Sequence, residues 1–167
     1  NGLPYGPLAT TARPGFTFAG WFTAADAAVT AGTVVTVASN HTLYAHWTPN
    51  PPLTVTFDPQ GGSAPVPPTT AVTNGLPYGP LATTARSGYT FAGWFTGATG
   101  TGSEIVPASP VTVTVDHTLY AKWTPNAVMT VTFDAQGGSA PVPAATNVTF
   151  DAPYGPLPAT AREGYSF

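Results

Sequence analysis

The three histidines are the side chains of this sequence best suited to acid–base chemistry. A serine hydrolase would need one of them as a base, beside a nucleophile and an orienting carboxylate. His41 and His117 occupy equivalent places in two copies of a repeated block, but His46 is replaced by Lys122 in the second copy. No catalytic constellation therefore repeats, and we expect that the chain is not an enzyme.

Metal and cofactor sites are equally poorly supported by the residue types present. His41 and His46 are five residues apart, a spacing that on one strand points them to opposite faces. Asp58 and Asp134 each stand shortly before a Gly-Gly pair, where turn chemistry is expected, and lack the dense oxygen ligands that calcium prefers. The sequence contains no cysteine, which excludes thiol chemistry and a disulfide scaffold. We expect no catalytic, cofactor-binding or metal-binding residues.

Aromatic rings are the remaining residue type with binding chemistry, because they can stack on a sugar or pack against a neighbouring module. The candidates for module packing or binding are Trp21, Phe22, Tyr44, Trp94, Phe95 and Tyr120. Trp94 and Phe95 are adjacent, and a regular strand would send the two rings to opposite sides. Whichever ring stays exposed could form a stacking platform.

Composition limits the class of partner. Charged residues make up 7% of the 167 residues and hydrophobic residues 43%, so the chain can fold but carries little charge. The net charge of −3 gives no electrostatic reason to bind nucleic acid or an anionic membrane. No apolar stretch approaches the roughly 18 residues of a membrane span. We expect no nucleic-acid partner and no membrane contact by this segment.

Internal repeats organise the whole chain. Four blocks recur along the chain. Asn1 to Arg13 recurs as Asn74 to Arg86 and, in related form, as Tyr154 to Arg162, and Gly15 to Phe22 recurs as Gly88 to Phe95. His41 to Thr48 recurs as His117 to Thr124, and Thr54 to Asp58 recurs as Thr130 to Asp134. The offset is 73 residues in the first two blocks and 76 in the last two. Three residues were therefore added between the Gly15-to-Phe22 block and the His41-to-Thr48 block in the second copy, which predicts a longer loop there.

These motifs, in this order and spacing, resemble the Listeria–Bacteroides repeat, also called the internalin B-repeat, found in tandem on bacterial surface proteins. The motifs are Val-Thr-Phe-Asp-x-x-Gly-Gly, Gly-Tyr-Thr-Phe-x-Gly-Trp and Leu-Tyr-Ala-x-Trp-Thr, and they cover essentially the whole chain. The resemblance implies a compact β-grasp-like module, secretion, and a role in surface display, spacing or adhesion. It brings no catalytic residues with it. Where the family has a short helix, this chain has Tyr78-Gly-Pro-Leu81, and glycine and proline disfavour more than one helical turn.

The predicted fold is mainly β, as small α+β, β-grasp-like modules of about 75 residues. We expect a partial module without its first strand at 1–50, a complete module at 53–126 and a partial module without its last strands at 127–167. Short Pro-rich linkers, Thr48 to Pro52 and Thr124 to Asn126, join them. Prolines should stiffen these connectors.

Period-2 patterns predict the strands of the complete module. They are Thr54 to Asp58, Tyr89 to Phe95, Val111 to Val115 and Thr118 to Trp123, with a turn at Asp116-His117. Glycine inside a strand often marks a bulge, so bulges are expected at Ala19-Gly20 and Ala92-Gly93. The expected core consists of Val55, Phe57, Phe91, Trp94, Leu119 and Trp123.

The favoured function is a structural repeat of an extracellular bacterial surface protein, acting as stalk, spacer or self-assembling fibre subunit. Its partners would be neighbouring copies of itself, within the chain or as head-to-tail subunits. The alternative is an adhesive module that binds a carbohydrate or a host surface protein through an exposed ring. Either function places the chain at the bacterial cell surface or in the secreted fraction.

Overall fold

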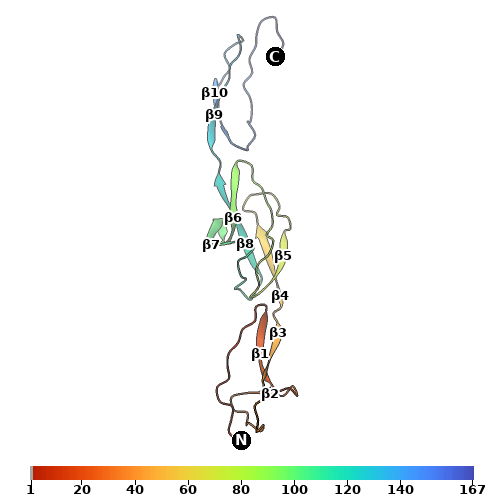
Figure 1. Ribbon diagram of the computed structural model, residues 1–167. Coiled ribbons are helices and arrows are strands. Elements are labelled where there is room, and N and C mark those ends of the chain that lie inside the picture. Colours follow the sequence, from red (N-terminus) through yellow and green to blue (C-terminus); the bar gives the residue numbers. More distant parts are fainter. Residues whose placement is uncertain (1) are drawn as a thin grey trace. The chain divides into compact units, whose positions relative to one another are not determined.

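The computed structural model describes residues 2–167 and is mainly β (Figure 1). The strands are β1 (Phe16–Phe22), β2 (Ala28–Val29), β3 (Tyr44–Pro49), β4 (Pro52–Asp58), β5 (Thr69–Thr73), β6 (Tyr89–Gly97), β7 (Thr101–Ile105), β8 (His117–Pro125), β9 (Val128–Thr132) and β10 (Ala145–Thr149). They form three sheets with the orders β2-β1-β3, β5-β4-β8-β6-β7 and β10-β9. Within residues 2–167 the only helix is one 3-10 turn, η1 (Ala98–Gly100). The predicted mainly β class is confirmed.

Contacts divide the chain into two compact units. The first contains the chain up to Thr56, Thr69–Leu81 and Val106–His117, and the second contains Phe57–Pro68, Ala82–Ile105 and Thr118–Phe167. The module boundaries at 1–50, 53–126 and 127–167 follow the sequence repeat and stay a prediction.

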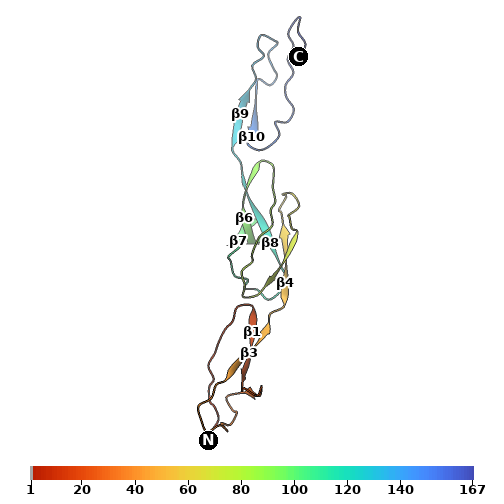
Figure 2. The same ribbon diagram turned by 45° about the vertical axis from the view of Figure 1, so that its right-hand side comes forward.

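In each of the first two copies, the aromatic strand pairs antiparallel with the strand that closes the copy. β1 pairs with β3, and β6 pairs with β8 (Figures 1 and 2). The register shifts between Phe18 and Gly20 in the first pair and between Phe91 and Gly93 in the second. The two glycines have φ of 131° and 127°, a region that side-chain-bearing residues rarely adopt. Both predicted bulges are confirmed.

The three-residue insertion lies in the hairpin that follows the aromatic strand. β1 turns into β2 through residues 23–27, whereas β6 continues to Gly97 and turns into β7 through η1. Thr99, inside η1, has φ of 61°. The predicted longer loop is wrong: the connection is residues 98–100 in the second copy against 23–27 in the first, because the added residues extend the two paired strands instead.

The first strand of the complete copy alternates as its sequence indicates. Leu53, Val55 and Phe57 of β4 are buried, while the residues between them are exposed. At the last residue of the strand, Asp58 Oδ1 accepts a hydrogen bond from Gln60 N at 2.9 Å. This Asx turn is the turn chemistry expected of an aspartate at that place.

Two predictions for the segment before β8 are wrong. Residues 111–115 form no strand, and His117 is the first residue of β8 rather than part of a turn. The backbone of Val111 bonds to the preceding loop, from its N to Leu76 O at 2.8 Å and from Gly75 N to its O at 2.9 Å. Val115 is 64% exposed. Alternation of Val and Thr gives strand propensity, but a strand also needs a continuous partner, and this segment pairs only around Val111.

Most of the predicted core is buried. Val55, Phe57, Trp94 and Leu119 are buried, Trp123 is half-buried, and Phe91 is 36% exposed. Phe91 pairs with Trp123 across β6 and β8, and its ring meets that indole edge to face with centroids 5.3 Å apart. The Phe91 ring also meets Trp94 edge to face, with centroids 5.5 Å apart. Phe91 therefore lies at the rim of the core, and its predicted place in the buried core is wrong because these two edge contacts leave part of the ring exposed.

Candidate functional site

The two candidate tryptophans pack inside their own copies. Trp94 is 2% exposed, and its Nε1 donates a hydrogen bond to Ala82 O at 2.8 Å. Trp21 is half-buried and makes the same bond, to Ala9 O, also at 2.8 Å. A buried indole N–H needs an acceptor, and here the acceptor is a carbonyl twelve residues earlier in both copies. Neither indole is a free stacking platform.

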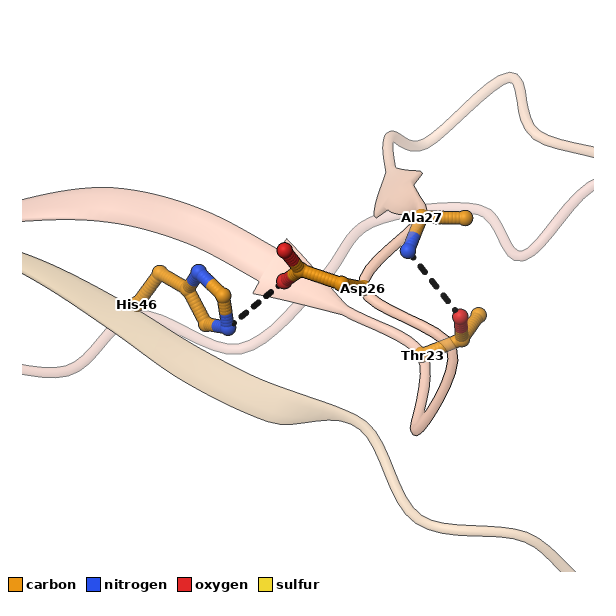
Figure 3. A network of polar contacts seen from close by, with 4 residues as sticks. All are labelled: Thr23, Asp26, Ala27 and His46. Carbon is orange, nitrogen blue, oxygen red and sulfur yellow. Dashed lines mark hydrogen bonds and ion pairs between the residues drawn. The ribbon is translucent and has the colours of Figure 1, made fainter.

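The other candidates of the first copy gather around a histidine. Figure 3 shows Asp26 of the β1–β2 turn reaching His46, with Oδ1 and Nε2 3.2 Å apart. The imidazole also stacks on Phe22, with ring centroids 3.9 Å apart and an interplanar angle of 15°. Phe22 pairs with Tyr44, whose side chain is 51% exposed. These four residues, Phe22, Asp26, Tyr44 and His46, form what we call the first ring cluster.

The second copy builds an equivalent cluster with a lysine in place of the histidine. Phe95 pairs with Tyr120 on β8 and with Glu104 on β7, and both rings are half-buried. Lys122 Nζ lies 4.7 Å from the centroid of the Phe95 ring. The longer hairpin places Gly100 against this lysine, because a Cβ added there would lie 2.5 Å from Lys122 Cγ. A side chain from the closing strand thus covers the phenylalanine ring in both copies, His46 on Phe22 and Lys122 on Phe95, and the second contact is a cation–π interaction.

A tyrosine–histidine pair also repeats, and sequence reasoning did not identify it. Tyr78 Oη lies 2.7 Å from His117 Nε2, while His117 Nδ1 lies 3.2 Å from Val115 O. With Nδ1 protonated toward that carbonyl, Nε2 accepts a hydrogen bond from the tyrosine hydroxyl. Tyr5 and His41 form the same pair in the first copy. The available signal was that the Tyr-Gly-Pro-Leu and His-Thr-Leu-Tyr blocks recur together.

Burial changes the acidity of one member of these pairs. Tyr78 is 7% exposed, and desolvation raises the pKa of its hydroxyl above 10.0. The neutral phenol that donates to His117 is thereby favoured. The pair is thus suited to holding a loop against β8.

The repeated arginines stack on the aromatic residue three positions later. Their guanidinium carbons lie 3.9 Å, 3.8 Å and 4.3 Å from the ring centroids in the pairs Arg13–Phe16, Arg86–Tyr89 and Arg162–Tyr165. Arg86 and Arg162 also donate to the carbonyls of Gln60 and Gln136, at 3.3 Å and 3.1 Å. These contacts give the three arginines a structural role within their own copies.

One groove in the first unit borders the exposed tyrosine. It encloses about 430 Å³ and is lined in part by Tyr5, Val37, His41 and Tyr44. Its walls are mainly apolar, with the tyrosine–histidine pair along one side. A ring-bearing or sugar-like ligand would meet aromatic surface there.

Comparison with known proteins gives a family match along the chain. The model of the Listeria-Bacteroides repeat domain matches residues 4–46, 54–122 and 130–167. A protein named "Putative Gly-rich membrane protein" from Evansella cellulosilytica is 34% identical over 139 residues, which cover 76% of this chain and 16% of that protein. No solved structure matches the chain. In residues 2–167 no helix has the length and apolar character needed to span a bilayer.

Proposed function

Because the chain belongs to the Listeria-Bacteroides repeat domain family, we propose that it is a structural segment of an extracellular bacterial surface protein. In this role tandem modules act as a stalk, a spacer or a fibre subunit, and their partners are neighbouring copies. The finer organisation belongs to the same proposal, namely β-grasp-like modules of about 75 residues joined by Pro-rich linkers. In these modules the extended Tyr78–Leu81 segment takes the place of a helix.

The observation that carries the proposal is the repeated internal use of the same polar and aromatic groups. Trp21 and Trp94 make identical indole–carbonyl bonds. His41 and His117 are each bonded to a tyrosine of their own copy. Groups that could bind a ligand or act as a base therefore have structural partners, which supports a non-catalytic module in which the repeated feature is the internal packing.

A reach assay tests the spacer role. The chain is displayed on bacteria between a surface anchor and a terminal epitope, and is compared with a version lacking residues 54–129. That deletion joins Leu53 to Thr130, the counterpart of Thr54 in the repeat. The height of the epitope above the cell surface, measured by super-resolution microscopy, should fall with equal display levels. Equal heights would reject the spacer role.

An adhesive role is the second candidate, supported by the exposure of Tyr44 beside the groove that contains Tyr5 and His41. An exposed aromatic ring can stack on the apolar face of a sugar. On a glycan array, Tyr44→Ala should abolish binding that the parent chain shows, while Tyr154→Ala, at a site 62% exposed, should preserve it. Absence of binding by the parent chain would reject this alternative.

A further inference from the structure

Two turns at strand starts have an unexpectedly buried glycine. The turns at Arg13–Phe16 and Arg86–Tyr89 are closed by hydrogen bonds from Phe16 N to Arg13 O and from Tyr89 N to Arg86 O, both 3.1 Å. Their glycines, Gly15 and Gly88, have φ of 78° and 76° and are buried. A glycine at the tip of a turn is normally exposed, so another part of the chain must cover each one.

The linker asparagine covers the turn from one side. Asn50 N donates to Gly15 O at 2.9 Å, and Asn126 N donates to Gly88 O at 2.9 Å. Each side chain then accepts a bond at Oδ1 from a threonine hydroxyl on the preceding aromatic strand, Thr17 or Thr90, at 2.7 Å in both cases. The same arrangement of turn carbonyl, linker asparagine and strand threonine is thus present at both linkers.

The other end of each asparagine amide points to the following copy. Asn50 Nδ2 donates to Asn74 O at 3.0 Å, and Asn126 Nδ2 donates to Phe150 O at 3.0 Å. Asn74 and Phe150 both follow the threonine that ends an edge strand, β5 or β10. Because the acceptor is a backbone carbonyl, the residue that carries it can be asparagine at the first linker and phenylalanine at the second without loss of the bond.

The turn also touches the following copy directly. A Cβ added at Gly75 would lie 2.9 Å from Gly15 N, and one added at Gly15 would lie 3.2 Å from Leu76 Cγ. At the second linker, Gly88 N and Ser87 Oγ donate to Asp151 O at 2.8 Å and 3.0 Å. The two surfaces approach closely because the turn carries glycine.

We infer that the Pro-Asn linkers are locked joints rather than free hinges, each closed by one asparagine amide that bridges two consecutive modules. The inference rests on the proposed modular array and names its interaction surface, with the next copy of the module as partner. An amide is required because Oδ1 must accept from threonine while Nδ2 donates to a carbonyl. Aspartate keeps the acceptor but loses the donor and places negative charge against a carbonyl oxygen.

Distance measurements across the first joint test this inference. The chain has no cysteine, so Thr36→Cys and Thr112→Cys, at two exposed positions, provide unique spin-label sites. The parent chain should give a narrow distance distribution by double electron–electron resonance. Asn50→Asp should broaden it about twofold or more, as expected for a short linker released from its contacts.

Two variants serve as controls, and a third is a second test of the joint. Asn40→Asp makes the same chemical change at an exposed position and should leave the width unchanged. Asn126→Asp should also leave it unchanged, because its contacts belong to the other linker. Thr17→Val, which removes only the hydroxyl donor to Asn50, should also broaden the distribution, and it provides the test if Asn50→Asp fails to fold.

Either of two results would overturn the locked joint: a broad distribution in the parent chain, or the parent's width in both Asn50→Asp and Thr17→Val. Neither result bears on the reach assay, which responds to the number of modules. A surface spacer with flexible joints would still lose height when one module is deleted. Failure of the joint and failure of the proposed function are thus distinguishable.

Discussion

At the scale of single residues, the buried hydroxyl of Tyr78 should make the free energy of unfolding depend on pH in the alkaline range. Burial raises the pKa of this phenol, so above about pH 10 the native state holds a proton that the unfolded state releases. The contribution of the neutral Tyr78 hydroxyl to the free energy of unfolding is complete below about pH 10, and it is lost as the pH rises through the pKa of the folded state. Urea unfolding between pH 8 and 11 should therefore show a decline that is smaller in Tyr78→Phe.

The same substitution also removes the bond to His117, and at neutral pH it should cost about 1 kcal/mol. An alkaline decline as steep in Tyr78→Phe as in the parent chain would contradict the assignment. This pair could not be found from one copy of the sequence, because Tyr78 and His117 are separated by 39 residues and no local pattern links them.

At the scale of elements, the bulges of β1 and β6 depend on glycine for backbone conformation more than for space. Gly93 has φ of 127°, and the nearest atom to an added Cβ would be Glu104 Oε1, 2.9 Å away at the flexible end of that side chain. Gly93→Ala should lower the free energy of unfolding by more than about 1 kcal/mol, because alanine is strained at that φ. Urea unfolding measures the loss.

A matched exchange separates this strain from a general effect of replacing glycine. Gly32 has nothing within 4 Å of an added Cβ and no positive φ, so Gly32→Ala should be close to neutral. Gly20→Ala, at φ of 131°, should behave like Gly93→Ala. Equal stabilities of Gly32→Ala and Gly93→Ala would contradict the bulge argument.

The elements that the sequence predicts correctly are those with a local cause. The alternation in Thr54 to Asp58 predicts a strand, and the glycine before Trp94 predicts a bulge. Both patterns involve only a few neighbouring residues, and the structure contains the strand and the bulge. The segment 111–115 alternates equally well but forms no strand. Whether a partner continues beside it depends on the loop around Gly75, which its own residues do not specify.

At the scale of the whole molecule, stabilising contacts are unevenly distributed between the copies. The second copy contains most of the buried hydrophobic residues, including Trp94, Val111 and Leu119. In the third copy Tyr154, Leu157 and Tyr165 are all more than 60% exposed, at 62%, 63% and 68%. Local opening is easiest where few apolar contacts must break, so the last residues should open before the centre.

Trypsin can measure this difference because the sequence has only four basic residues. Arg13 precedes proline, a bond that trypsin does not cut. Arg86 is half-buried, and Lys122 lies within β8, so cutting either requires an ordered segment to open. Arg162 lies in an exposed turn, and its stacking on Tyr165 and bond to Gln136 O are solvent-accessible contacts.

Under native conditions the first cleavage should therefore follow Arg162, and the product should be a stable fragment of residues 1–162 by mass spectrometry. Cleavage after Arg86 or Lys122 should accelerate only when urea unfolds the centre, because proteolysis follows the population of the open form. Gly93→Ala should speed cleavage at Lys122 without changing the rate at Arg162. If native cleavage began at Lys122, the central sheet would be less stable than the exposed turn, contrary to the burial of Trp94 and Leu119.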